Sequence, residues 1–177
     1  MVKPIILVVG AIPVIFASLI AISLLTQPEI PFSAANPDDV LELEYTKHQL
    51  KKISFGVTER VGAQKTEILS INKNGDIRYT VTEEGIPNPD KIAKIDESAM
   101  KKLTALIKET GFMAMPVESF PIKNDVTEYQ KSTFKITLNN NIKQIHWPEQ
   151  NATDTFIPPI ISLVESELDK IIDQLIE

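Results

Sequence analysis

The residues best suited to acid–base or metal chemistry are two histidines, His48 and His146. Glu44 precedes His48 by four residues, so a helix would place a carboxylate and an imidazole on one face. The apolar alternation over 41–45 instead predicts a strand, which would separate the two groups. His146 lies at the end of a predicted strand, on the face opposite Trp147, as is typical of a surface residue. We therefore expect neither histidine to bind a metal or to act as a catalytic base.

The cysteine, serine, glycine and acidic residue patterns of known catalytic, metal and phosphate sites are absent from the sequence. The chain has no cysteine, which excludes thiolate nucleophiles, zinc–thiolate sites, disulfides and a lipid-modified cysteine. No serine lies in the turn of a hydrolase nucleophile, and the six glycines form no phosphate-binding loop. Two of the 24 acidic residues would suffice for general acid–base catalysis, but no spacing singles out a pair. We predict no catalytic residue, metal or cofactor.

Two further residues are candidates for a role at the surface. Asn151 begins the sequence Asn-Ala-Thr, a glycosylation acceptor in an exported protein, on a loop between a strand and a helix. Trp147 is the only tryptophan and precedes Pro148 at a strand end. There it would contact a partner or a carbohydrate, although packing in the core is the favoured interpretation. The acidic residues of the last helix would form either a solvated face or a docking surface for a basic partner.

The first element that would position these residues is a long apolar segment. Residues 5–25 are almost purely apolar, and no charged side chain lies between Pro4 and Pro28. A spanning helix needs about 20 such residues, whereas a cleavable signal has an apolar region of only about 7–15 residues followed closely by small ones. The nearest suitable small-residue sequence, 33–35, lies too far downstream. An uncleaved transmembrane anchor over 1–28 is therefore favoured over a cleaved signal.

The charges that flank this segment predict its orientation. Lys3 precedes it and only acidic residues follow it closely, which favours a single-pass protein of the cytoplasmic membrane with its N-terminus inside and its C-terminal domain outside. Pro13 should kink the helix near its middle. Small residues would let the helix pack against a neighbouring one. The candidates for this membrane-helix packing are Gly10, Ala11, Pro13, Ala17 and Ala21.

The rest of the chain is acidic. Residues 29–40 contain prolines and little periodicity, which predicts an extended linker. After residue 28 the chain carries 17 basic and 24 acidic side chains, a net charge of -7. That charge argues against non-specific binding of nucleic acids and against adhesion to anionic lipid headgroups. The predicted partners are the bilayer itself and other membrane-protein subunits, with no nucleic acid and no identified ligand.

The sequence pattern over residues 41–177 predicts an extracytoplasmic α+β domain. The order of elements is β-β-β-α-β-β-α, which predicts an antiparallel sheet of about five strands with two helices on one face. The expected elements are a strand over 52–60, hairpins over 66–85 and 132–148, and helices over 96–110 and 158–176.

Matching the apolar faces of each hairpin predicts its turn. In the first hairpin, a type I turn with a left-handed glycine bulge at Gly75 pairs Asn72 with Asp76 and keeps the apolar residues on one side. In the second, the faces agree only if the asparagine-rich loop has an even number of residues, so we expect two. Asp96 is expected to cap the first helix and Gly111 to end it.

These segments resemble a widespread, uncharacterised family of small exported domains. The resemblance rests on "INKNGDIRYT", the helix ending "TGFMAM", the later "TFKITLNNNIKQI" and the closing helix, and it covers roughly 53–177. Such domains pair a "dG.v.y" hairpin with a helix ending in "gF"; this chain lacks the Cys-Pro element of some members. One N-terminal span before an acidic domain rich in Ile, Lys and Asn is also similar to surface proteins of ammonia-oxidising archaea. That resemblance implies an accessory subunit of a membrane enzyme.

These features together predict a membrane-anchored extracytoplasmic interaction protein, a non-catalytic accessory subunit of a membrane complex. One alternative is an exported domain that binds or senses a small ligand in a pocket between sheet and helices. A second alternative is an enzyme that uses carboxylates alone.

Overall fold

The computed structural model describes residues 17–18 and 34–176. The chain divides into two units, Met1–Ile30 and Pro31–Glu177, and the elements described below belong to the second. The predicted anchor over 1–28 lies outside the described residues except for 17–18, as does the start of the linker. Within the described ranges, no helix is both long and apolar enough to cross a membrane.

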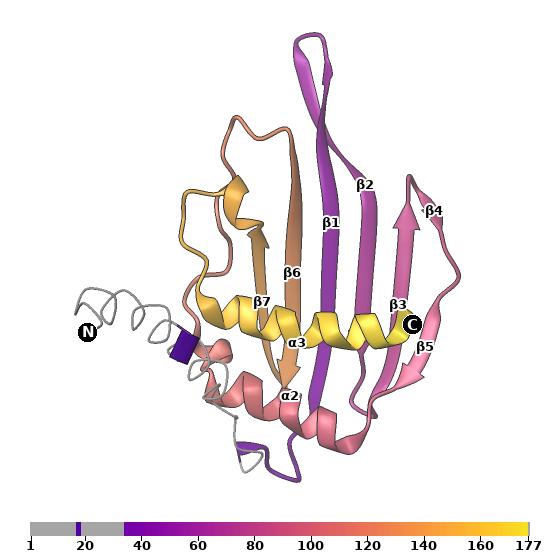
Figure 1. Ribbon diagram of the computed structural model, residues 1–177, viewed down its shortest axis with the longest axis vertical. Coiled ribbons are helices and arrows are strands. Elements are labelled where there is room, and N and C mark those ends of the chain that lie inside the picture. Colours follow the sequence, from indigo (N-terminus) through magenta and orange to yellow (C-terminus); the bar gives the residue numbers. More distant parts are fainter. Residues whose placement is uncertain (1–16, 19–33, 177) are drawn as a thin grey trace, which may run out of the picture. The chain divides into compact units, whose positions relative to one another are not determined.

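The second unit is a mixed α+β domain built on one large antiparallel sheet (Figure 1). Its strands are β1 (Leu41–Phe55), β2 (Thr58–Ile71), β3 (Asp76–Glu83), β4 (Ile86–Pro87), β5 (Lys91–Lys94), β6 (Glu128–Leu138) and β7 (Asn141–Pro148). Their order in space is β4-β3-β2-β1-β6-β7, and β5 also pairs with β3. The helices α2 (Glu97–Glu109) and α3 (Pro159–Ile176) lie on the same face of this sheet (Figure 1). Two short 3-10 helices, η2 (Phe112–Ala114) and η3 (Gln150–Ala152), lie in the connections.

The predicted number of five strands is wrong, because the sheet has seven. The strands β4 and β5 contain two and four residues, too few for an alternating pattern to be recognised. The strand predicted over 52–60 is the end of β1 and the start of β2, joined by a turn at Gly56, whose φ is +67°. Apolar residues alternate through this turn, so periodicity alone did not reveal it.

Both hairpin turns are confirmed. In the β2–β3 turn, Asn72 N donates to Asp76 O at 3.0 Å, and Gly75 adopts a φ of +79°. A side chain at Gly75 would also approach Ile95, so only glycine fits there without strain. The β6–β7 turn has two residues, Asn139 and Asn140, both with positive φ, as a tight hairpin requires.

The caps of α2 are also confirmed. Asp96 accepts a hydrogen bond from Ala99 N at 2.8 Å, and Gly111 takes the left-handed conformation just after the helix. The buried residues of α3 are Ile161, Val164, Leu168 and Ile172. Ile172 is the last buried residue of this stripe.

The core lies between the helices and one face of the sheet. Alternate residues of β1, Leu43 and Tyr45, point into it, and Tyr45 is aligned with Leu69 on β2 and Phe134 on β6. Each such apolar side chain contributes about 1.5–3 kcal/mol on burial. The other face of the sheet carries the polar residues of each strand, and neither α2 nor α3 covers it (Figure 1).

Candidate functional site

An aromatic cluster forms the floor of the region beneath α3. The ring centroid of Phe134 lies 4.4 Å from that of Trp147 and 4.8 Å from that of Tyr45. The indole of Trp147 stacks on Tyr45 at 6.5 Å and is only 3% exposed. The structure therefore places Trp147 in the core, where its ring is not presented to a partner as a surface anchor.

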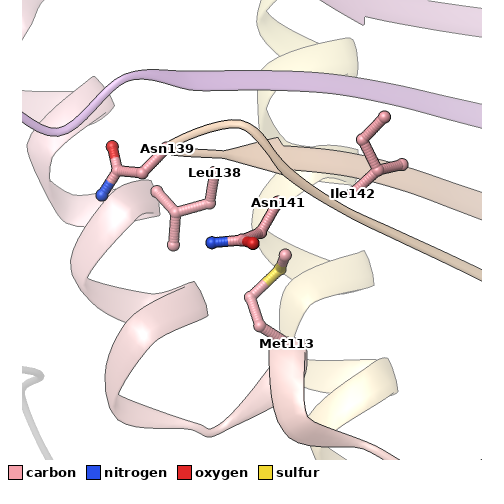
Figure 2. Close-up of a pocket in the computed structure, with 5 residues that line it drawn as sticks. All are labelled: Met113, Leu138, Asn139, Asn141 and Ile142. Atoms are coloured by element: carbon pink, nitrogen blue, oxygen red, sulfur yellow. The ribbon is translucent and has the colours of Figure 1, made fainter.

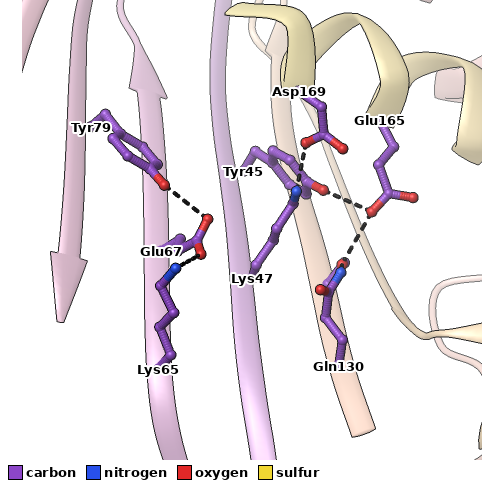
Figure 3. A network of polar contacts seen from close by, with 9 residues as sticks. Tyr45, Lys47, Lys65, Glu67, Tyr79, Gln130, Glu165 and Asp169 are labelled. Atoms are coloured by element: carbon purple, nitrogen blue, oxygen red, sulfur yellow. Dashed lines mark hydrogen bonds and ion pairs between the residues drawn. The ribbon is translucent and has the colours of Figure 1, made fainter. Parts of the chain in front are cut away.

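Polar side chains on α3 reach down to this floor and form the α3 network, which we define as Tyr45, Lys47, Ser132, Glu165 and Asp169 (Figure 3). The Tyr45 hydroxyl donates to Glu165 Oε1 at 2.7 Å, and Ser132 donates to the same oxygen at 3.3 Å. Lys47 Nζ pairs with Asp169 at 2.6 Å. Burial and the negative charge of Glu165 raise the pKa of Tyr45, so this phenol stays protonated and acts as a donor.

A second group lies beside the network on β2 and β3 (Figure 3). Lys65 Nζ lies 2.6 Å from Glu67, which also accepts a hydrogen bond from the Tyr79 hydroxyl at 2.8 Å. Burial alone would raise the pKa of Glu67, but these two donors bring it below its usual value. Lys65 therefore balances the negative charge of Glu67, and this carboxylate has a structural role.

A cavity of about 230 Å³ opens beside the α3 network, between the sheet, η3 and the first turns of α3. We call it the α3 cavity. Trp147, Pro148 and Ile157 supply its apolar wall, and Gln130, Ser132, Glu149 and Glu165 supply its main polar groups. The cavity thus combines an apolar surface with polar side chains, as small-molecule sites do, at a volume below their common range of about 300–1,000 Å³.

A second hollow of about 380 Å³ lies at the β6–β7 turn, beside η2, and Figure 2 shows the residues around it. Leu138, Asn139, Asn141, Ile142 and Met113 line it. Asn139 is already engaged, because its amide accepts from Val40 N and donates to Asp39. No charged side chain lines the hollow, so we assign no catalytic or ligand-binding role to it.

The most prominent surface feature is the arm, which we define as residues 52–61. Here β1 and β2 continue as a two-stranded ribbon beyond the rest of the sheet, and Figure 1 shows this hairpin projecting past its neighbours. The pairing of β1 with β6 stops at Lys51, and that of β2 with β3 begins only at Lys65. The arm exposes Ile53, Val57 and Val61 to solvent.

The two histidines lie on the helix-free face of the sheet. His48 Nδ1 is 3.0 Å from Thr66 Oγ1, and His146 Nδ1 is 2.9 Å from Thr133 Oγ1. Glu44 and His48 are four residues apart on β1, about 13 Å at the rise of an extended strand. Among the described residues, no group of three His, Cys, Asp or Glu side chains is placed to hold a metal ion.

The pKa values of both histidines lie below their usual range, because burial and the nearby positive charge of Lys131 disfavour the imidazolium. The carboxylate of Glu118 only partly opposes this at His146. Their ordinary value is about 6.5, so near pH 6 the unfolded chain binds more protons than the folded one. The free energy of unfolding should therefore fall as the pH is lowered from 7.5 to 5.5.

Urea unfolding at pH 7.5 and 5.5 measures the decrease in the free energy of unfolding. This decrease should be smaller in the His48→Gln/His146→Gln double variant. The pKa values of Asp39 and Glu67 lie below their ordinary values of 3.8 and 4.5, so both groups are ionised in the folded and the unfolded chain and contribute little in this window. An equal loss in the double variant would contradict the assignment to the imidazoles.

The remaining predicted surface residues are placed as follows. Asn151 is exposed at η3, whereas Thr153, the third residue of its sequon, is 2% exposed and accepts a hydrogen bond from Thr155 N. The acidic residues of α3 are largely engaged: Asp169 pairs with Lys47, and Glu167 with two lysines. The membrane-helix candidates Gly10, Ala11, Pro13 and Ala21 lie outside the described residues; Ala17 is exposed in a described helical pair.

The α3 network and the α3 cavity were not predicted from the sequence. Tyr45, Ser132 and Glu165 come from segments far apart in the chain, and only the folded sheet brings them together. The one local signal was the alternation over 41–45, which places Tyr45 and Lys47 on the helix-facing side of β1. No family model matches the chain, and no curated protein matches it.

Proposed function

We propose that this chain is a membrane-anchored extracytoplasmic interaction protein, a non-catalytic accessory subunit of a membrane complex. Residues 5–25 would form the single span, with the N-terminus inside and the domain outside. The small residues Gly10, Ala11, Ala17 and Ala21 and the kink at Pro13 would pack against a span of the partner. By resemblance alone, the partner would be a membrane enzyme such as an oxidoreductase.

The observation that carries this proposal is the arm. Three exposed aliphatic side chains, Ile53, Val57 and Val61, lie on a ribbon that adds nothing to the core. Along 53–57 and 59–61, no third strand of the described chain pairs with the outer edge of β1 or β2. Unpaired strand edges and exposed apolar side chains are costly in a monomer and are used for recognition of partners.

The direction of the arm supports a partner outside the membrane. The first residue of β1, Leu41, directly follows the predicted linker, and the strand then runs 15 residues to the arm. The tip therefore lies about 46 Å from the point at which the chain enters the domain. An anchored domain would reach away from its own attachment point with this arm (Figure 1).

Serine substitution of the arm should reduce capture of the partner subunits at least tenfold. The variant is Ile53→Ser/Val57→Ser/Val61→Ser, and a total loss of about 1.4 kcal/mol of binding free energy over the three positions already corresponds to tenfold. The measurement is quantitative pull-down of the tagged full chain from its native membranes in mild detergent.

The matched control is Ile86→Ser, which removes an aliphatic side chain that is 69% exposed on β4. It should leave the captured subunits unchanged. A wild-type chain that runs as a lone monomer at native expression would refute the proposal, as would an arm variant that captures as much as the control.

A further inference from the structure

The charged side chains that line the α3 cavity are all acidic. Two carboxylates, Glu149 and Glu165, line it, and none of the described residues that line it is a lysine, arginine or histidine. An anionic ligand would meet two like charges there and would be repelled. The chemistry of the lining thus selects a cation or a neutral molecule.

Glu165 differs from its neighbours on α3 in having no cationic partner. Asp169 pairs with Lys47, and Glu167 lies within ion-pair distance of two lysines. Glu165 is held by two neutral donors, the hydroxyls of Tyr45 and Ser132, and no ion pair within the described chain compensates its charge. Glu149 likewise has no ion-pair partner there, and its carboxylate accepts only the backbone N–H of Gln130.

Only one of the two carboxylate oxygens of Glu165 accepts hydrogen bonds from the described residues. Both hydroxyl donors contact Oε1, and among the described contacts none reaches Oε2. No buried side-chain oxygen of the described residues lacks a hydrogen-bond partner, so Oε2 must retain access to solvent or to the cavity. The fixed oxygen therefore orients the group, and the other oxygen is free to accept a ligand.

The protein already binds an ammonium group of its own one helical turn away. Lys47 Nζ lies 2.6 Å from Asp169 and 5.2 Å from the centre of the Tyr45 ring. A carboxylate of α3 and an aromatic ring of the floor thus hold a cation together. Glu165, four residues before Asp169 on the same helix, lines the cavity together with a second aromatic ring, that of Trp147.

We propose that the α3 cavity binds a small organic cation, with a primary ammonium group on Glu165 and a short carbon chain against Trp147, Pro148 and Ile157. Glu149 adds to the negative field at the cavity. The aromatic contacts of Trp147 with Phe134 and Tyr45 fix the apolar wall before a ligand arrives. This site is separate from the arm and does not depend on the proposed partner.

Trp147 makes the test direct, because it is the only tryptophan of the chain and it lines the cavity. The full chain in a neutral detergent is titrated with n-butylammonium chloride at constant ionic strength, and the tryptophan emission is recorded. We expect a saturable change with n-butylammonium and at least tenfold weaker responses with n-butanol, which has the same carbon chain, and with sodium butyrate.

Two variants locate the binding. Glu165→Gln retains the shape and an acceptor for Tyr45 but removes the charge, and it should weaken n-butylammonium binding at least tenfold. Glu167→Gln, on the same helix but not lining the cavity, should bind as the wild type does. Far-ultraviolet circular dichroism confirms that both are folded.

The result is unambiguous in each direction. Selective, saturable binding that is lost in Glu165→Gln and kept in Glu167→Gln supports the site. The absence of a saturable change, an equal response to n-butanol, or equal binding by Glu165→Gln would overturn it. A destabilised Glu165→Gln is replaced by Glu149→Gln, which must then weaken the same binding for the proposal to stand.

Discussion

Replacing Phe134 with alanine is expected to lower the free energy of unfolding by about 3–5 kcal/mol. The ring is 0% exposed and contacts the rings of Tyr45, Phe112 and Trp147. Its strand, β6, is held between β1 and β7, so the backbone cannot move inward to fill the space that the ring leaves. Urea unfolding followed by circular dichroism measures the change.

Phe156→Ala is the matched control, because it removes the same side chain from a position that is 70% exposed. The loss there should stay within about 0.5 kcal/mol. A domain of this kind is stable by only about 5–15 kcal/mol, so the Phe134 variant should unfold at a clearly lower urea concentration. Equal losses in the two variants would contradict the described packing.

Deleting residues 2–28 is expected to transfer nearly all of the protein from the membrane fraction to the soluble fraction. Each leucine, isoleucine, valine or phenylalanine near the middle of a span favours insertion by about 0.3–0.6 kcal/mol, and residues 5–25 consist largely of such residues. The rest of the chain has a net charge of -7, so anionic headgroups would repel it. Electrostatic attraction would therefore not replace the lost insertion of residues 5–25. Immunoblots of carbonate-washed membranes and of the wash measure the distribution.

The wild-type chain should remain in the washed membranes with residues 1–28 still attached. Mass spectrometry of the mature N-terminus distinguishes the alternative, since a cleaved signal would leave a chain that starts downstream of the apolar segment. A wild-type chain found in the wash, or a truncated chain that stays in the membranes, would contradict the anchor.

Local patterns predicted the turns and caps of this fold well. The turn at Asn72–Gly75 follows from the need to keep apolar residues of both strands on one face, and the two-residue turn at Asn139 follows from the same argument. Asp96 was predicted as a cap because its carboxylate can accept from the first turn of a helix. Each of these inferences uses residues that are close in sequence.

The features that depend on distant residues were not predicted. The alternation of Ile53 and Val57 continues through the β1–β2 turn, so the sequence showed one strand where the fold has the ends of two. Glu165 meets Tyr45 across 120 residues of chain, and no spacing in the sequence predicts such a contact. The arm, the α3 network and the α3 cavity are therefore properties of the folded sheet.

The position of β1 also determines how the domain would respond to mechanical load. This strand directly follows the predicted linker, yet it lies in the middle of the sheet, paired with β2 along one edge and with β6 along the other. Its hydrogen bonds run perpendicular to its length. A pull on residue 40 along the strand would therefore load both ladders in shear, with the force shared by many hydrogen bonds at once instead of opening them one by one. If the domain is tethered through residue 40, it would resist a tension that would peel away an edge strand.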